Sequence, residues 1–185
     1  MTTPRTILET PRLVLRELTC NDLDFVALML ADPEVMRYWP RCQTREEAEG
    51  WIRRQLDRYA QHGCGYWLAL AKDSGAPVGQ LGVLPNRPPG VPELDIGYII
   101  HRPFWRKGYA TEGSVACRDH AFYALDQPSV VCTIRPENKP SQGVAVRAGF
   151  TLDGRRTEIA GLDHLVFVAH RPRESRLGGA GTAHP

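Results

Sequence analysis

Short apolar runs alternate along the chain with amphipathic segments, which predicts an interleaved series of strands and helices. Strands are predicted where residues are continuously apolar or alternate with polar ones, at 13–16, 66–71, 78–84, 93–101, 129–134, 151–156 and 165–169. Helices are predicted where apolar residues recur at helical spacing, from about residue 22, over 45–60 and over 110–124, with a short fourth helix opening at Ser141. This order predicts an α/β (α+β) fold with a mixed sheet flanked by helices.

The strand at 93–101 runs through a basic turn that contains Gly108 into the helix at 110–124. A helix start leaves backbone N–H groups without intrahelical partners and carries partial positive charge, so it can hold a phosphate through main-chain atoms. The turn lacks the Gly-Lys-Ser/Thr ending of a P-loop and the three spaced glycines of a dinucleotide-binding fingerprint. The segment therefore predicts a cradle for a phosphorylated ligand of another kind.

Length and composition fit one globular domain. The 185 residues are 42% hydrophobic and 24% charged, with a formal net charge of +2, which gives no argument for nucleic-acid binding. We expect a single domain over 1–170 and a flexible C-terminal tail over 171–185, where Gly, Arg and Pro are frequent.

The five cysteines are widely spaced and form no Cys-x-x-Cys pair, and the histidines show no metal-ligand spacing. Neither a disulfide framework nor a metal site is expected. The absence of a charged start with a long apolar run indicates neither a signal peptide nor a membrane span, so a cytoplasmic protein is expected.

Five segments occur in an order that makes the chain recognisable: 10–16 (TPRLVLR), 32–35 (DPEV), 79–82 in a hairpin strand, 97–112, and Asn138 with Ser141 and 149–150. Over residues 8–169 the chain resembles the GNAT superfamily of acyl-CoA-dependent N-acetyltransferases. The resemblance is to its RimJ/RimL-like branch, the ribosomal-protein-alanine acetyltransferase-like enzymes.

The resemblance implies a mostly antiparallel sheet whose central parallel pair, near 93–101 and 129–134, splays apart to admit the pantetheine arm of acetyl-CoA, the cosubstrate. It implies pantetheine contacts with backbone around Ile99 and Ile100. It further implies pyrophosphate contacts along the turn, at Arg106, Lys107, Gly108, Tyr109, Ala110 and Thr111. Trp105 stands where many relatives have Arg or Gln, three residues before the motif glycine, and Arg106 and Lys107 would supply the charge.

Acetyl transfer to an amine needs a neutral amine and therefore a proton acceptor. Glu93 and Asp95 lie two apart in the predicted strand, hence on one face, and Gly97 leaves space beside them. Glu93 can equally be a solvated residue after a loop. Asp95 lies between Leu94 and Ile96 and needs a partner if buried, so a structural hydrogen bond is the alternative to a role as base. Relatives usually carry glutamate where Asp95 stands.

Two residues after the second central strand have two interpretations each. Ser141 is the candidate that protonates the leaving thiolate, since the matching family serine lies near the cofactor sulfur; ordinary N-capping is the alternative. Asn138 either contacts pantetheine or shapes the turn at 136–140. Tyr38 and Trp39 either line the acceptor pocket or pack as a lid, and the loop at 86–90 is a candidate substrate lip.

The predicted function is acetyl-CoA-dependent N-acetyl transfer to a primary amine, either a protein N-terminal α-amine or a small-molecule amine. The competing hypothesis is a non-catalytic acyl-CoA-binding sensor or scaffold. No nucleic-acid or membrane partner is expected, and the chain is expected to be a monomer or a homodimer.

Overall fold

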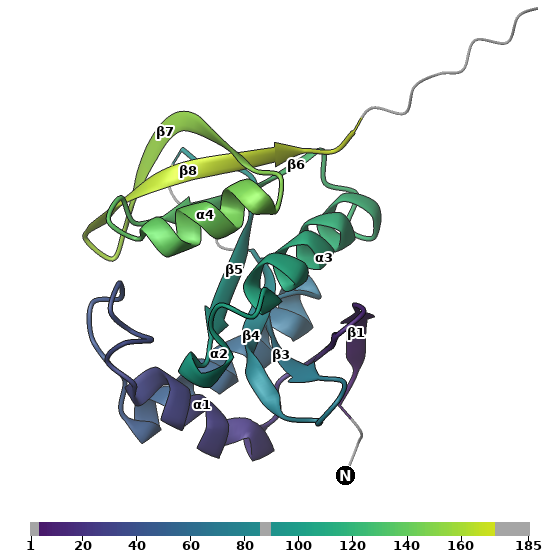
Figure 1. The fold of residues 1–185 in the computed structure, drawn as a ribbon, viewed down its shortest axis with the longest axis vertical. Coiled ribbons are helices and arrows are strands. Elements are labelled where there is room, and N and C mark those ends of the chain that lie inside the picture. Colours follow the sequence, from purple (N-terminus) through teal and green to yellow (C-terminus); the bar gives the residue numbers. More distant parts are fainter. Residues whose placement is uncertain (1–3, 86–89, 173–185) are drawn as a thin grey trace, which may run out of the picture.

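A computed structural model describes residues 4–85 and 90–172 and contains one eight-stranded sheet (Figure 1). Its spatial order is β1-β2-β3-β4-β5-β6-β8-β7. The strands span β1 (Thr6–Glu9), β2 (Leu13–Arg16), β3 (Tyr66–Ala71), β4 (Pro77–Leu84), β5 (Leu94–Ile100), β6 (Ser129–Ile134), β7 (Thr151–Ile159) and β8 (Leu162–His170). Within the described residues only β5 and β6 pair in parallel. The predicted mixed, mostly antiparallel fold is confirmed.

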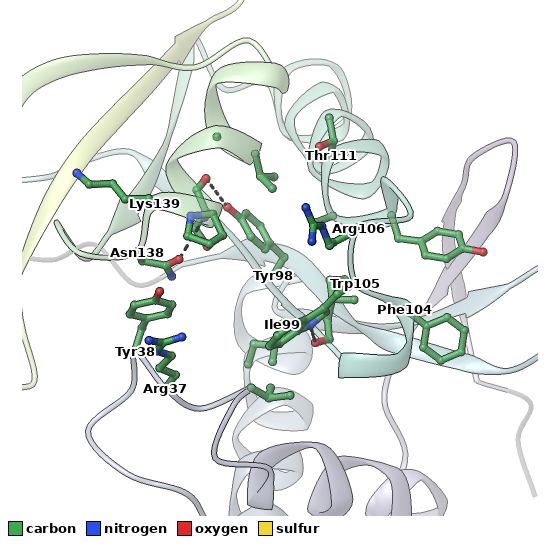
Figure 2. A pocket seen from close by; sticks show the side chains of 18 of the residues that line it. Arg37, Tyr38, Tyr98, Ile99, Phe104, Trp105, Arg106, Thr111, Asn138 and Lys139 are labelled. Carbon is green, nitrogen blue, oxygen red and sulfur yellow. Dashed lines mark hydrogen bonds between the residues drawn. The ribbon is translucent and has the colours of Figure 1, made fainter.

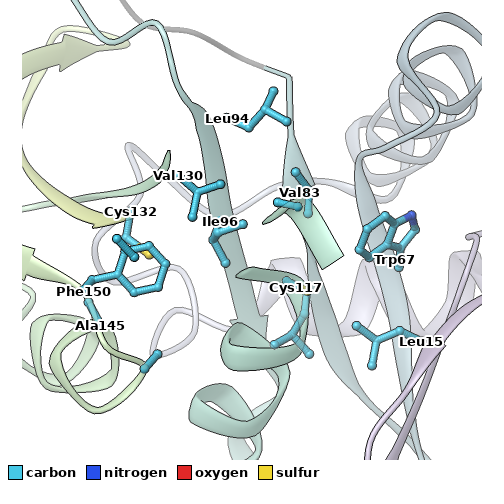
Figure 3. Close-up of a cluster of buried hydrophobic side chains, with 14 of the residues drawn as sticks. Leu15, Trp67, Val83, Leu94, Ile96, Cys117, Val130, Cys132, Ala145 and Phe150 are labelled. Atoms are coloured by element: carbon cyan, nitrogen blue, oxygen red, sulfur yellow. The ribbon is translucent and has the colours of Figure 1, made fainter. Parts of the chain in front are cut away.

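Four α-helices cover the two faces of this sheet: α1 (Leu23–Ala31), α2 (Arg45–His62), α3 (Tyr109–Tyr123) and α4 (Lys139–Arg147). Short 3-10 turns, η1 (Cys20–Asp22) and η2 (Arg102–Phe104), precede α1 and follow β5. Residues of α1 and α2 join one buried cluster, whereas residues of α3 and α4 join another on the opposite face (Figures 1 and 3). Helices therefore cover both faces of the sheet.

Strand periodicity divides the core between these faces. Tyr66 and Leu68 of β3 belong to the α1/α2 cluster, whereas Trp67 and Ala69 belong to the α3/α4 cluster. This is the alternation of a pleated strand. Figure 3 shows the α3/α4 side, where Ile96, Val130 and Cys132 meet across the central strands.

The central parallel pair diverges. Pairing is limited to Leu94 with Val130 and Asp95 with Val131, although β5 continues to Ile100 and β6 to Ile134. Beyond Asp95 the strands therefore leave each other, and an opening forms in the middle of the sheet. The implied splay is present.

Several predicted boundaries differ from the structure. The edge strand β1 is missing from the prediction, because its four residues pair with β2 through a register shift and are mostly exposed or half-buried. The fourth helix begins at Lys139 rather than Ser141. Most of the predicted lip, 86–89, lies outside the described residues, as does the predicted tail from 173. Arg171 itself is held, since its amide donates to the Pro128 carbonyl at 2.9 Å.

Candidate active site

The predicted cradle is built by two left-handed backbone positions before α3. Arg106 has φ of 61° and Gly108 has φ of 84°. Glycine adopts this conformation without steric cost, which is why Gly108 can turn the chain into the helix. The Glu112 amide bonds to the Gly108 carbonyl at 3.0 Å, so the preceding amides of the first turn lack intrahelical partners. These amides and the helix dipole favour an anion.

A cavity of about 740 Å³ opens beside this cradle and reaches the gap between β5 and β6 (Figure 2). Of the residues implied for the cofactor, all except Lys107 line it: Ile99, Ile100, Arg106, Gly108, Tyr109, Ala110, Thr111, Asn138 and Ser141. Four cationic side chains, Arg37, Arg106, Lys139 and Arg147, also line it, against one acid, Glu34. The residues present thus fit a long ligand that carries phosphates, such as acetyl-CoA.

Lys107 has a different position. Its ammonium lies 5.2 Å from the centre of the Phe104 ring, and its carbonyl accepts a hydrogen bond from Arg12 at 2.9 Å. Lys107 does not line the cavity, so the phosphate contact expected at this residue is not supported by the lining.

Trp105 contacts the strand that would bind pantetheine. Its indole Nε1 donates to the Ile100 carbonyl at 2.6 Å. The His101 amide donates to Val78 at 2.9 Å, and in an antiparallel ladder alternate residues bond the same neighbour. The backbone of Ile99 is thereby directed to β4, and that of Tyr98 and Ile100 to the gap. Of the two residues implied for pantetheine, Ile100 has the suitable backbone orientation.

The first turn of α3 is fixed by the N-terminal segment. Glu112 accepts hydrogen bonds from the Thr10 hydroxyl at 2.6 Å and from the Arg12 amide at 2.9 Å, and its carboxylate forms an ion pair with the Arg12 guanidinium at 2.6 Å. Although partial burial opposes this effect, the hydrogen bonds lower the pKa of Glu112. Arg12 also covers the Tyr109 ring at 4.7 Å. The segment 10–12 therefore clamps the helix start that forms the cradle.

Asp95 is buried where the parallel ladder ends. Its carboxylate accepts the Thr133 amide at 3.0 Å and the Thr133 hydroxyl at 2.5 Å. Burial raises the pKa of Asp95 to about 6, while the two Thr133 bonds act in the opposite direction. The Asp95 carboxylate thus accepts the hydrogen bond of the Thr133 amide, which a main-chain carbonyl would accept in a continuous ladder. A carboxyl group with a pKa near neutrality also suits proton transfer.

The space expected beside Gly97 is filled by Tyr66. A Cβ on Gly97 would lie 2.5 Å from the Tyr66 hydroxyl oxygen and 2.7 Å from Leu84 Cδ1. Burial and then the charge of Asp95 raise the pKa of the Tyr66 phenol. Gly97 is thus required for close packing, which brings a neutral phenol next to Asp95.

Glu93 lies apart from Asp95. It precedes β5 rather than belonging to it, so the expected shared strand face does not apply. Arg155 binds both of its oxygens, at 2.9 and 3.0 Å, and this contact lowers the pKa of Glu93. Glu93 also lines neither of the two cavities of this site. The structure therefore favours a structural ion pair over a role as base.

A second cavity, of about 670 Å³, lies on the Asp95 side of the opening. It is lined by Asp95, Gly97, Tyr66 and residues of α2. Five residues line both cavities, namely Tyr38, Trp39, Tyr98, Asn138 and Ser141. The two cavities therefore meet at the splay, as one space for a cosubstrate and one for an acceptor would. Tyr38 and Trp39 have the position predicted for acceptor-pocket residues.

Asn138, rather than Ser141, is the N-cap of the helix that follows β6. The N-cap of α4 is Asn138, whose side-chain oxygen accepts from the Ser141 amide at 3.1 Å. N-capping by Ser141 is therefore wrong, since Ser141 lies within the first turn. The Tyr98 hydroxyl donates to the Ser141 carbonyl at 2.9 Å and joins β5 to α4 across the gap (Figure 2).

Sequence reasoning missed Thr133, Tyr66 and Tyr98, which contact Asp95, Gly97 and Ser141 respectively. The one available signal was the isolated Gly97 inside an apolar strand, which indicates close approach of another group. In the described ranges, no cluster of three or more His, Cys, Asp or Glu side chains is arranged to hold a metal ion. Nor does any helix there have the length and hydrophobicity to span a membrane.

Comparison with known proteins places the chain in a family. The family model described as "Acetyltransferase (GNAT) domain" matches residues 12–151. The chain is 30% identical to YkkB, an uncharacterized protein of Bacillus subtilis, over 146 residues that cover 78% of this chain and 85% of YkkB. An acetyltransferase structure from Agrobacterium tumefaciens superposes with a TM-score of 0.77 at 30% identity, covering 92% of this chain and 97% of that one.

The chain belongs to the GNAT acetyltransferase family, whose members use acetyl-CoA. A structure of RimL, a ribosomal L7/L12 α-N-protein acetyltransferase in complex with coenzyme A, shares the fold, with a TM-score of 0.74 at 19% identity and coverage of 90% of this chain and 98% of RimL. The fold class and the cosubstrate expected from the sequence are confirmed.

Proposed function

We propose that the protein transfers an acetyl group from acetyl-CoA directly to a primary amine, with Asp95 as the base and Ser141 as the proton donor to the leaving group. The observation that carries the proposal is the meeting of two cavities at the splay. One has the phosphate cradle and the other has Asp95. Direct attack requires both substrates at such a junction.

The residues of the chain have separate tasks in this proposal. The first-turn amides of α3 and the cationic side chains of the first cavity hold the phosphates of acetyl-CoA, which supplies the acetyl group as a thioester. Asp95 accepts the proton of the amine, directly or through water. Ser141, which lines both cavities, protonates the thiolate in this proposal. Glu93 has no part, because Arg155 binds it.

The acceptor is the finer part of the proposal. Resemblance to the RimJ/RimL branch favours a protein N-terminal α-amine, and the alternative is a small-molecule amine. The two-cavity arrangement and the presence of Asp95 and Ser141 favour an enzyme over a sensor that only binds acyl-CoA.

A thiol-release assay with acetyl-CoA and an amine panel tests the reaction. Asp95→Asn and Ser141→Ala, measured separately, are expected to reduce turnover by about 10²-fold and about tenfold, while CoA binding measured by calorimetry persists. Full activity in both variants would overturn the proposed roles. Binding of CoA without acetylation of any amine would favour the sensor.

A further inference from the structure

One face of α2 presents two arginines and a tryptophan to the acceptor-side cavity. Trp51, Arg54 and Arg58 are separated by three and four residues, so they share a helix face. All three line the second cavity. The neighbouring Arg53 does not line it and instead forms an ion pair with Glu49 at 2.5 Å.

The two arginines of this face repel each other. Like charges four residues apart on a helix are destabilising, and Arg58 is half-buried. Burial and the charge of Arg54 both lower the pKa of Arg58. Among the contacts of Arg58, its Nη1 donates to the side-chain oxygen of Gln55 at 3.1 Å. An anion bound between the two guanidinium groups would remove this repulsion.

A third arginine lines the same cavity from β6. Arg135 follows that strand, and its Nη2 forms an ion pair with Glu137. Its Nε is buried and has no hydrogen-bond partner among the described residues. A buried donor without an acceptor is costly, and an anionic ligand would satisfy it.

Two acids line the cavity as well, Asp95 and Glu158. Both oxygens of Asp95 accept hydrogen bonds from Thr133. Three aromatic side chains form one part of the wall: the Trp51 ring lies 5.8 Å from Trp39 and 5.3 Å from Tyr66. Flat apolar groups pack well against such a wall.

We propose that the acceptor is a primary amine whose own molecule carries a carboxylate a few bonds away, with the carboxylate held by the arginines of the second cavity. The inference rests on the proposed acetyl transfer. The amine nitrogen bonds to the acetyl carbon as the carbon–sulfur bond breaks. The amine proton is lost, coenzyme A leaves as the thiol, and the carboxylate is unchanged.

Tryptophan and tryptophan amide are a matched pair of probes. Loss of the carboxylate lowers the pKa of the neighbouring amine, so the amide has more neutral amine at pH 7 and is the chemically favoured acceptor. We expect kcat/KM for tryptophan to exceed that for the amide by about tenfold. A second pair of probes is the amidated peptides Ala-Asp-Gly and Ala-Asn-Gly, whose acetylation is followed by consumption of acetyl-CoA. Acetylation of these peptides indicates a protein N-terminus as acceptor, and acetylation of tryptophan alone indicates a free amino acid.

Arg54→Gln and Arg58→Gln are each expected to bring the acid-to-amide ratio towards one. The ratio is measured on one enzyme preparation, so it does not depend on the folded fraction. Arg53→Gln is the matched control and is expected to leave the ratio unchanged. Ratios of one for both probe pairs in the wild-type enzyme, or an equal loss in Arg53→Gln, would overturn the inference. Failure to acetylate any amine would instead overturn the proposed function.

Discussion

The Asp95 side chain has two roles, a structural role in the sheet and the proposed chemical role as base. Its carboxylate accepts both the amide and the hydroxyl of Thr133, which joins β5 to β6 at the last residue pair before they diverge. The same burial that makes these bonds strong raises the pKa of Asp95 to about 6. The aspartate side chain is long enough to place both of its oxygens against Thr133 of the adjacent strand.

Two substitutions of Asp95 distinguish its structural role from its proposed role as base. Asparagine keeps an acceptor for Thr133 and removes the charge, so kcat/KM is expected to fall by about 10²-fold. The wild-type pH profile of kcat/KM should contain an apparent pKa near 6 that the Asn variant lacks. Alanine removes both hydrogen bonds, and we expect it to lower the free energy of unfolding by about 1–3 kcal/mol, measured by urea denaturation.

The sign of the stability effect follows from the raised pKa. Ionisation of Asp95 is less favourable in the folded protein than in the unfolded chain, so its stabilising contribution is complete below about pH 4 and is lost as pH rises to about 6. The Asp95→Asn variant does not lose stability in this way, because asparagine does not ionise. The melting temperature of the Asn variant relative to wild type should therefore be higher at pH 7 than at pH 4; the opposite trend would contradict the assignment.

At the scale of elements, the start of α3 depends on a partner distant in the sequence. The segment before β2 binds Glu112 through Thr10 and Arg12, and Arg12 also binds the Lys107 carbonyl. A Cβ on Gly113 would lie 2.3 Å from Leu81 Cδ2, so the helix also packs closely on β4. These contacts fix the cradle with respect to the sheet.

Arg12→Ala is expected to raise KM for acetyl-CoA by about tenfold and to change kcat by less than about twofold, because it releases the cradle and leaves the Asp95 side intact. Arg12→Lys keeps one ion-pair contact and should give an intermediate KM. The double variant Arg12→Ala with Glu112→Ala should resemble the single variants, since the two residues act as a unit.

Arg156→Ala is a suitable control for this prediction. Arg156 forms an exposed ion pair with Asp163, at 2.6 Å, on the β7–β8 hairpin, and it lines neither cavity. Its loss should leave KM for acetyl-CoA unchanged. If the effects of Arg12→Ala and Glu112→Ala on KM for acetyl-CoA are additive in the double variant, the two residues do not act as a unit.

At the scale of the whole molecule, the cosubstrate would bridge two parts of one sheet. In the part of the chain that the structure describes, β5 pairs with β6 at two positions. The Asp95–Thr133 and Tyr98–Ser141 hydrogen bonds add contacts between the two parts. The first cavity is lined by residues from both sides of the gap, including Ile100 and Asn138. A ligand there stabilises the folded state by linkage.

Coenzyme A at 100 times its Kd is expected to add about 2.7 kcal/mol to the free energy of unfolding, which for a chain of this length corresponds to a rise of about 5–10 °C in Tm. Differential scanning fluorimetry measures the shift. Adenosine 3′,5′-bisphosphate lacks the pantetheine arm and, at the same concentration as coenzyme A, should give a smaller shift. Equal shifts for the two ligands would contradict a role of the splay in binding.

Much of the fold could be predicted because its signals are local. The α2 face repeats Ala48, Trp51 and Ile52 at helical spacing, and its N-cap Thr44 forms a capping box with Glu47. Strand β1 could not be predicted, since four residues at an edge give too little periodicity. The start of α4 was misplaced because both Asn138 and Ser141 are good caps, and only the backbone shows which one is used.

In the candidate site, residues that are contiguous in the sequence were predicted better than contacts between residues distant in the sequence. The cradle residues lie in one continuous turn, so their order in the chain is also their order in space. Glu93 was assigned to Asp95's strand face, but Arg155, 62 residues away, binds it. Nothing in the sequence near either residue indicates that contact.

By itself, the sequence determined the order of the helices and of every strand except β1, the turn at Gly108 that opens α3, and the acid in β5. These depend on conformational preferences and spacing over a few residues. The tertiary structure decided which groups are partners: Thr133 for Asp95, Arg12 for Glu112 across 100 residues, and Arg155 for Glu93. Burial, pKa and the two cavities depend on such distant contacts, which form only when the sheet assembles.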